Sequence, residues 1–381
     1  MKKRIWLLCS YVVVAALATL MTLGVMEKRE VPSKLEQVEN LIQQRFIGEA
    51  DQETLEDAAA SAMISATGDR WSYYIPASEY QTYQEQMSNA YVGVGITIQA
   101  QRDDSGFLIV SVTSGGSAEE AGFQVNDLLI MVDNQDVRGM TAEEVRNLVK
   151  GEQGTTVNLT VLRTGEPVTA QVERRKVETA VASYQMLGGK TGLVTIENFD
   201  ERCAEETIAA IEALLDQGAE KLIFDVRNNP GGYATELVKV LDYLLPEGEV
   251  FHTVDYSGKE SIDYSDASCL ELPMAVLVNG NTYSAAEFFA AALQENEAAV
   301  VLGEKTVGKG YFQTTFCLND GSAVSLSIGE YFTPKGKNLA GVGVTPDKIV
   351  AVDEETAAAI YRGLVTPEED PQIQAALKEL K

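Results

Sequence analysis

Apolar residues repeat at helical spacing near the start of the chain. Ser33 and Glu36 form a capping-box pattern. An apolar stripe follows at Leu35, Val38, Leu41, Ile42 and Phe46. An alanine-rich helix is expected at about 53–66, and a polar helix at about 77–88. Residues 29–90 are therefore predicted to be a helical region, and the apolar stripe makes a homodimer a plausible assembly.

The next pattern predicts a small β-rich unit at residues 91–175. Alternating and β-branched runs predict strands at 91–98, 107–112, 128–132, 156–162 and 168–172. Thr141 and Glu144 form a second capping box, which opens a short helix that Gly151 ends. Such short strands with one helix indicate a domain of its own.

After residue 175 the pattern changes to strands that alternate with helices, which is typical of an α/β domain. Apolar runs predict strands at 192–196, 221–226, 274–278 and 299–302, with helices at about 204–217 and 284–294. The turn residues Asn319-Asp320-Gly321 predict a hairpin. Residues 176–350 are assigned to this core, and residues 351–381 to a C-terminal helical tail.

An uncharged segment follows the basic residues at the N-terminus. Residues 5–26 at about 1.5 Å per residue span roughly 33 Å, enough to cross a membrane. The positive-inside rule places everything after Glu27 outside the cytoplasm. A cleaved signal peptide is the alternative, and it gives the same compartment. Residues 1–28 are therefore expected to be a basic tip and a transmembrane signal anchor of a single-pass cell-membrane protein.

Charge and composition exclude several classes of function. The 381 residues include 57 acidic and 30 basic side chains, a formal net charge of −27, which opposes binding to nucleic acid. Cys203, Cys269 and Cys317 lie far apart and form no CxxC motif. The only histidine, His252, leaves little material for a zinc site. Neither a metal nor another cofactor is expected.

Candidate chemistry starts at Ser284. A buried strand ends, a polar turn follows, and this serine opens a helix, so its hydroxyl lies beside free backbone N–H groups. A plain N-cap serine is the commoner interpretation of such a residue. A serine nucleophile also needs a base, and His252 lies in a short β-branched run that favours a structural strand histidine.

Lys309 is the other candidate base. Lysine serves as a base only where burial lowers its pKa enough to make it neutral near pH 7. Glycines at 308 and 310 allow a close approach of the backbone, and Gln313, four residues on, could orient the amine. A solvated loop lysine is the alternative interpretation.

Acyl transfer also needs an oxyanion hole. Gly231 and Gly232 follow a buried strand and precede a helix, so both can present backbone N–H groups, as can Ala285 after the candidate nucleophile. A plain strand–helix turn or an anion site is the alternative. The order of these segments relative to Ser284 is similar to that of the Clp protease–crotonase architecture.

Together these blocks resemble the carboxyl-terminal processing peptidases, also called tail-specific proteases. The blocks are Arg227–Gly232, Ser284–Glu287, and Gly303–Gly310 with Gln313. In that family a serine and a lysine form the catalytic dyad and a glutamine positions the lysine. The resemblance gives these roles to Ser284, Lys309 and Gln313, and it extends over about residues 30–381. One departure is Tyr283, where relatives usually carry a small residue, and it is expected to narrow the site.

The resemblance also implies that residues 91–175 are a PDZ domain, inserted before an α/β peptidase core of Clp protease–crotonase-like type. A glycine turn offers successive backbone N–H groups to a terminal carboxylate, and a peptide would add as a strand. The expected peptide-binding residues are Val92, Gly93, Val94, Gly95, Ile96, Val145, Val149 and Lys150. Lys150 is further expected to report peptide occupancy to the active site. A β-domain without a ligand is the alternative.

These features predict an extracytoplasmic serine endopeptidase that acts on proteins or peptides with free C-terminal tails through an acyl-enzyme. An anchored PDZ scaffold with an inactive or gated peptidase-like domain is the main alternative. Loss of Ser284, Lys309 or Gln313 would mark an inactive domain, and all three are present. A crotonase-like acyl-CoA enzyme is a second alternative. It would need a basic phosphate site, which this acidic chain does not favour.

Overall fold

The computed structural model describes residues 32–380, which divide into two compact units at Tyr74 and Ile75. The first unit contains helices α2 (Lys34–Arg45) and α3 (Gln52–Ser65). The capping box of Ser33 and Glu36 is confirmed, because each residue accepts a hydrogen bond from the backbone of the other. The apolar stripe of α2 is largely exposed within this unit.

The predicted transmembrane anchor, residues 1–28, lies outside the described residues. Within residues 32–380, the structure contains no helix with the length and apolar character needed to span a membrane.

The second unit begins, after the short strand β1 (Tyr73–Ile75), with α4 (Ala77–Met87) and the expected β-rich unit. Its sheet runs in the order β3-β4-β5-β7-β8, with β6 beside β5. The strands are β3 (Ile96–Ala100), β4 (Phe107–Val112), β5 (Leu128–Val132), β6 (Gln135–Asp136), β7 (Thr156–Arg163) and β8 (Glu166–Glu173). Helices α5 (Ser117–Glu120) and α6 (Ala142–Val149) complete it, and α6 has the predicted capping box at Thr141.

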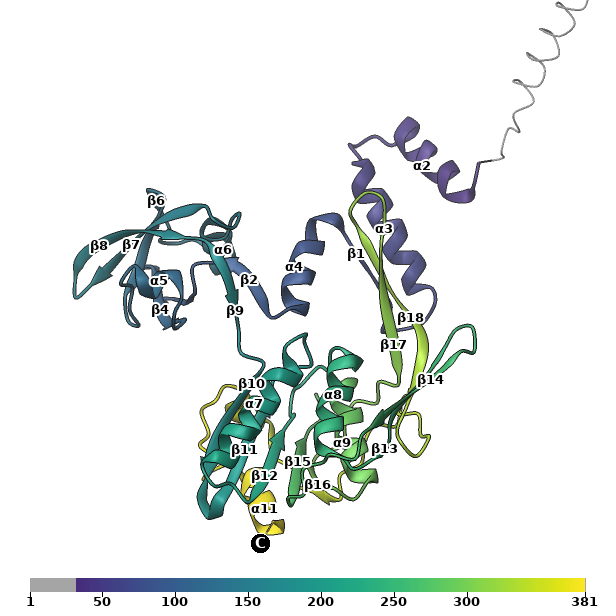
Figure 1. Ribbon diagram of the computed structural model, residues 1–381. Helices are drawn as coiled ribbons and strands as arrows, with labels where there is room; N and C mark the ends of the chain where they lie inside the picture. The colour runs from purple at the N-terminus through teal and green to yellow at the C-terminus, as the bar shows by residue number, and fades with distance from the viewer. Residues whose placement is uncertain (1–31, 381) are drawn as a thin grey trace, which may run out of the picture. The chain divides into compact units, whose positions relative to one another are not determined.

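The single strand expected at 91–98 is in fact two strands. Gly95 has φ +79°, a left-handed conformation that breaks the strand at this point. The first half, β2 (Ala90–Gly93), pairs with β9 (Arg175–Glu178), while the second half, β3, pairs with β4. The chain therefore enters and leaves the β-rich unit through one two-stranded ribbon (Figure 1).

The core is a six-stranded sheet in the order β10-β11-β12-β15-β16-β19. The strands are β10 (Ala182–Leu187), β11 (Thr191–Ile196), β12 (Lys221–Asp225), β15 (Met274–Val278), β16 (Ala299–Gly303) and β19 (Lys348–Ile349), and η1 (Gly188–Lys190) joins the first two. All neighbouring pairs are parallel except β10 with β11. Because β12, β15 and β16 are central, they are buried on both faces and read as continuous apolar runs.

Side chains of one strand alternate between two apolar layers. Val276 packs in the layer with helices α7 (Cys203–Asp216), α8 (Ala234–Leu244) and α9 (Ala285–Glu295), whereas its neighbour Leu277 packs in the layer with α11 (Pro371–Glu379). Helix α10 (Glu354–Tyr361) precedes α11. The segment expected to be a C-terminal tail is therefore helical, and α11 forms one layer of the core (Figure 1).

Strands β13 (Gly248–Asp255), β14 (Glu260–Ser265), β17 (Tyr311–Cys317) and β18 (Ala323–Phe332) belong to a second sheet. The hairpin predicted at residues 319–321 joins β17 to β18. His252 lies in β13, as expected for a strand histidine, and its ring packs 5.3 Å from that of Phe332, measured between centroids. In α4, the hydroxyl of Tyr83 lies 3.0 Å from that of Thr315 in β17.

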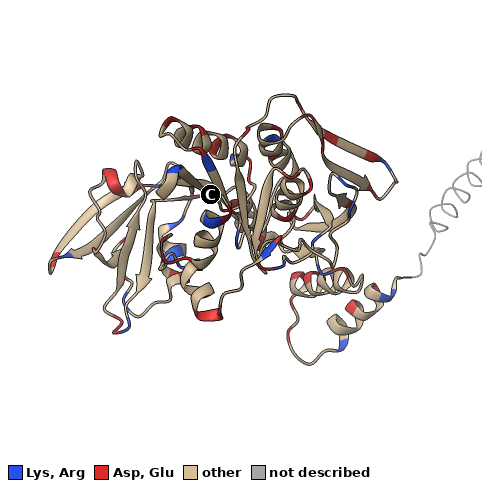
Figure 2. Ribbon diagram, turned by 90° about the horizontal axis from the view of Figure 1, so that it is seen from below, with Lys and Arg blue, Asp and Glu red and all other residues tan. Residues whose placement is uncertain are grey.

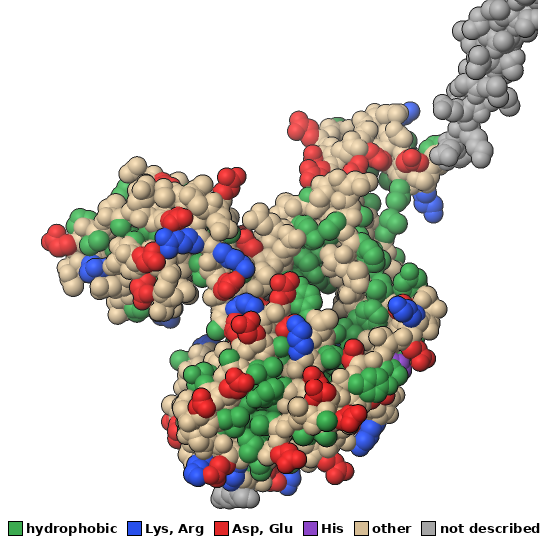
Figure 3. Space-filling view, in the orientation of Figure 1, with side chains coloured by type: hydrophobic (Ala, Val, Ile, Leu, Met, Phe, Trp, Pro, Cys, Tyr) green, Lys and Arg blue, Asp and Glu red, His purple; other side chains and the backbone are tan. Residues whose placement is uncertain are grey.

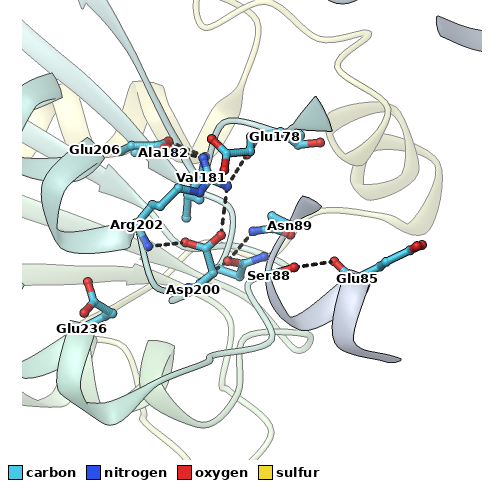
Figure 4. Close-up of polar contacts among 12 residues, drawn as sticks. Glu85, Ser88, Asn89, Glu178, Val181, Ala182, Asp200, Arg202, Glu206 and Glu236 are labelled. Carbon is cyan, nitrogen blue, oxygen red and sulfur yellow. Dashed lines mark hydrogen bonds and ion pairs between the residues drawn. The ribbon is translucent and has the colours of Figure 1, made fainter. Parts of the chain in front are cut away.

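The segment between β9 and β10, where the chain enters the core, is held by α7. Glu206 accepts hydrogen bonds from the backbone N–H groups of Val181 (2.6 Å) and Ala182 (3.2 Å). Arg202 forms ion pairs with Glu206 and Asp200. Figure 4 shows this cluster beside the junction. These contacts fix the start of the core sheet.

Charge is spread over the described surface. In Figure 2, Lys and Arg residues are scattered over the ribbon among Asp and Glu residues rather than gathered in one stripe. Figure 3 shows acidic side chains on both the β-rich unit and the core. The strongly negative net charge is therefore not confined to one patch in these views.

Candidate active site

Three loops of the core follow neighbouring parallel strands. Residues 226–233 follow β12, residues 279–284 follow β15, and residues 304–310 follow β16. The carboxyl ends of parallel strands meet at one edge of a sheet, which is where ligands of open α/β sheets bind. The three loops carry, in turn, the predicted oxyanion-hole glycines, Ser284 and Lys309. The fold therefore brings residues that are distant in the sequence to one edge of the sheet.

Ser284 has an unusual backbone conformation. Its φ is +59° and its ψ is −132°, outside the regions that residues with a side chain ordinarily occupy. It holds the N-cap position of α9, but an ordinary N-cap residue has β-region dihedrals, so capping alone does not explain it. Backbone strain of this kind costs about 1–3 kcal/mol and tends to cluster at functional sites.

Gly231 is packed directly against this serine. A Cβ at Gly231 would lie 2.7 Å from the Cβ of Ser284 and 2.9 Å from the backbone N of Ala285. Real Cβ atoms do not approach so closely, and Gly231 also has φ +88°, so only glycine fits here.

Glu287 connects the serine turn to the lysine loop. This fully buried carboxyl accepts hydrogen bonds through Oε2 from the backbone N–H groups of Ser284 (2.9 Å) and Lys309 (2.8 Å). Through Oε1 it accepts from the N–H of Gly308 (2.7 Å) and from the hydroxyl of Thr306. Burial raises the pKa of Glu287, while these donors act in the opposite direction. The structure therefore brings Ser284 and Lys309 onto adjoining loops.

The side chain of Lys309 lies next to an aromatic ring. Its Nζ is 5.9 Å from the ring centroid of Tyr283, the residue before the candidate nucleophile. Tyr283, which stands where relatives usually carry a small residue, therefore lies next to the candidate base. Burial raises the pKa of the Tyr283 phenol. This ring therefore borders the space where Lys309 and Ser284 would act.

Gln313 lies in β17 and is fixed by its amide nitrogen. This nitrogen donates to the hydroxyl of Ser327 (2.9 Å) and to the backbone oxygen of Tyr311 (3.1 Å). An orienting hydrogen bond to the Lys309 amine would therefore use the carbonyl oxygen of Gln313.

The predicted oxyanion hole needs one correction. The N–H of Gly231 donates to Oδ1 of Asn229 (2.8 Å), so this donor is engaged inside its own loop. Gly231 instead provides the close approach to the serine. Of the predicted donors, Gly232 and Ala285 remain as candidates. A Cβ at Gly232 would lie 2.2 Å from the backbone oxygen of Phe199, so this position also requires glycine.

Asparagine and threonine side chains hold the first two loops together. Asn279 accepts a hydrogen bond from the N–H of Asn228 (3.0 Å) and donates back to its side chain (2.9 Å). Thr282 donates to the backbone oxygen of Val226 (2.8 Å). Neither these residues nor Glu287 could be assigned a role from the sequence, because turn asparagines are common and the partners of these side chains are distant in sequence.

The β-rich unit contains a groove of about 700 Å³ bordered by β3 and α6. Predicted peptide-binding residues that line it are Gly93, Val94, Gly95, Ile96, Val149 and Lys150. Two predictions are corrected. Val92 and Val145 are not among the residues that line the groove, and Val145 is fully buried in the apolar core of the unit.

One side of the groove comes from α4. Glu85 of this helix lines the groove and forms an ion pair with Lys150 at the end of α6 (2.5 Å). The Lys150 amine also lies 5.9 Å from the ring centroid of Tyr91. Arg146 is a further lining residue that the sequence analysis did not assign.

Comparison with known proteins places this geometry in a family. The model of peptidase family S41 matches residues 190–350, and a PDZ-domain model matches residues 108–163. A protein of Staphylococcus saprophyticus named "Probable CtpA-like serine protease" is 31% identical over 354 residues, which cover 90% of this chain and 72% of that protein. The chain belongs to peptidase family S41.

Further comparisons agree with this assignment. A protein of the same name from Staphylococcus aureus strain N315 is 31% identical over 320 residues, although the chain spans only 64% of its length. A solved structure from Bacteroides fragilis described as a candidate S41 protease has a TM-score of 0.53 at 16% identity, over 84% of this chain and 89% of that one, and it supports the fold alone. This S41 member is therefore a serine-type peptidase with a PDZ domain, as the sequence predicted.

Proposed function

We propose that this S41 peptidase is an extracytoplasmic endopeptidase that cleaves proteins at or near their C-terminal tails, with Ser284 as nucleophile and Lys309 as base. One observation carries the proposal. Ser284 and Lys309 donate their backbone N–H groups to the same carboxylate oxygen of Glu287, so the two candidate residues occupy adjoining loops at the edge of the sheet.

The chemistry follows from the groups present. Neutral Lys309 accepts the proton of Ser284 as Oγ attacks the substrate carbonyl. Backbone N–H groups of Ala285 and Gly232 stabilise the oxyanion. The protonated lysine then gives its proton to the leaving amine, and water hydrolyses the acyl-enzyme. Gln313 orients the amine through its carbonyl oxygen.

Substrate selection is assigned to the PDZ groove. A free tail carboxylate would bind the backbone N–H groups of the glycine turn that precedes β3, and its apolar last side chain would face Ile96 and Val149. The pairing of Lys150 with Glu85 supports a reporting role for Lys150, because α4 also contacts β17, the strand that carries Gln313.

The first test is cleavage of a reporter protein with an apolar C-terminal tail by the full chain in detergent. We expect cleavage by the wild type, and we expect amidation of the tail to lower kcat/KM by about 10- to 100-fold. The reason is that a charge-assisted hydrogen bond contributes about 1.5–3 kcal/mol.

The control is a peptide that carries the same cleavage site but lacks the apolar C-terminal tail. Amidation of its C-terminus should leave its kcat/KM unchanged. Equal cleavage of free and amidated tails would reject tail recognition. Tail binding without cleavage by any form would favour the alternative of a scaffold or a gated enzyme.

The proposal includes attachment to the cell membrane through residues 1–28, with the peptidase on the outer side. Support comes from the uncharged run at residues 5–26 behind a basic tip. The outer membrane or wall is first permeabilised while the cytoplasmic membrane stays intact, and an external protease is then added. This protease should digest the PDZ and peptidase domains while cytoplasmic marker proteins survive.

We also propose that helix α2 pairs two copies of the chain. Leu35, Val38 and Leu41 are 50%, 49% and 58% exposed along one stripe. We expect the full chain in detergent to sediment as a dimer, and Leu41→Lys to shift it to a monomer. Glu39→Lys, which changes a polar position of the same helix, is the control and should leave the dimer intact. A wild-type monomer at all concentrations would contradict the pairing.

A further inference from the structure

We propose that Glu287 is a positioning residue of the catalytic site, whose carboxylate sets the separation between the serine turn and the lysine loop. The inference rests on the proposed function of Ser284 and Lys309. It concerns a buried acidic group that the mechanism above does not use.

The contacts of Glu287 are divided between the two loops. Oε2 takes one donor from each, the N–H of Ser284 at 2.9 Å and the N–H of Lys309 at 2.8 Å. Oε1 takes the N–H of Gly308 at 2.7 Å and the hydroxyl of Thr306. Any movement of one loop relative to the other must therefore stretch bonds to this one side chain.

The donor set fits an ionised carboxylate. Both oxygens accept backbone N–H groups, and only a carboxylate has acceptor capacity at both positions without a competing proton. A glutamine of the same size would place an NH₂ group against donors of its own kind at one of the two positions. The site therefore depends on the chemistry of Glu287 and not only on its volume.

The lysine loop is also supported from its other side. The hydroxyl of Thr306 accepts a hydrogen bond from the N–H of Val344 (2.7 Å) while it donates to Glu287. A Cβ at Gly343 would lie 2.5 Å from the backbone oxygen of Thr306, so the chain at this point is closely packed. Thr306 therefore links the lysine loop both to the Glu287 carboxylate and to residues 343–344.

A purely structural role does not explain the arrangement well. Burial of a carboxylate is costly, and the donors to Glu287 are three backbone N–H groups and one hydroxyl, none of them cationic. Helix α8 begins without any side-chain cap, so a helix in this core does not require one. At Ser284, however, a strained backbone persists only if its surroundings over-determine it, and the bond to Glu287 supplies such a constraint.

The test compares Glu287→Gln with wild type in the full chain, with the tailed reporter as substrate. We expect kcat to fall about 100-fold, since a misplacement of about 1 Å costs that much, and we expect KM to change less than threefold, because the tail binds elsewhere. The matched control is Glu206→Gln. Glu206 also accepts two backbone N–H groups from a distant segment, and its variant should keep kcat within twofold.

A second pair of variants covers the case in which Glu287→Gln does not fold. Thr306→Val should lower kcat about 5- to 10-fold at unchanged KM, and Thr306→Ser, which restores the hydroxyl, should return it to within twofold of wild type. Thermal unfolding of each variant separates loss of fold from loss of rate.

The outcomes are distinguishable. A folded Glu287→Gln variant with a kcat within twofold of wild type overturns the inference, as does a Thr306→Val variant with full kcat. An equal loss in Thr306→Val and Thr306→Ser overturns it as well. If the wild type and Ser284→Ala behave alike, the proposed function itself fails.

Discussion

Ser284→Ala and Lys309→Ala are each expected to lower kcat for tail cleavage by about 10⁴-fold or more, and the double variant is expected to be no slower than either single variant. Residues that act as a unit show this lack of additivity, because removal of one partner already abolishes the step that both perform. The backbone N–H groups of both residues donate to one carboxylate oxygen of Glu287, which supports such a unit on geometric grounds.

The measurement is a double-mutant cycle on kcat, with saturating reporter and long incubation to reach the slow rates. Tail binding, followed by fluorescence anisotropy of a labelled peptide, should be unchanged in all variants because the groove lies in the PDZ domain. Lys305→Ala, an exposed lysine of the same loop, is the control and should keep near-normal kcat. Independent, additive losses would contradict a dyad.

Arg227→Met is expected to lower the free energy of unfolding of the core by about 3–5 kcal/mol. The Arg227 side chain is only 5% exposed and forms ion pairs with Asp225 (2.6 Å) and Asp370 (2.8 Å). Removal of one member of a buried ionic group leaves uncompensated charges, here two carboxylates. Asp370 also caps α11, through the N–H groups of Gln372 and Ile373, so this layer of the core should loosen.

Urea unfolding followed by far-UV circular dichroism measures this loss as a lower midpoint. Arg138→Met is the matched control, because Arg138 pairs with Asp136 at an exposed position of the PDZ domain. Exposed pairs contribute about 0–1 kcal/mol, so this variant should unfold near the wild-type midpoint. A similar small effect for Arg227→Met would show that the buried pairs are replaceable.

Local patterns predicted most of the fold. Met274–Val278 and Leu128–Val132 are strands with the expected bounds, because apolar runs between turn signals are readable within one segment. Both capping boxes were found because their partners are three residues apart. Family resemblance then placed Ser284 and Lys309 on loops that the structure brings together.

What the sequence missed depends on distant partners. The break at Gly95 is decided by β9, which lies some eighty residues further on. In the sequence, Glu287 is only the last residue of the block Ser284–Glu287, and its contacts with the lysine loop appear only when residues 306–309 fold beside it. Likewise, nothing local distinguishes Val145, which is fully buried, from Val149, which belongs to the same apolar core and also lines the groove.

The ribbon of β2 and β9 has a consequence for how such proteins can diversify. Both ends of the inserted domain leave from paired neighbours, Gly93 and Arg175, and paired strands lie about 4.8 Å apart. A tight turn could join these two points, and so could another compact module with adjacent termini. The PDZ domain is therefore a unit that evolution or an engineer could exchange without altering the order, along the chain, of the loops that carry Ser284 and Lys309.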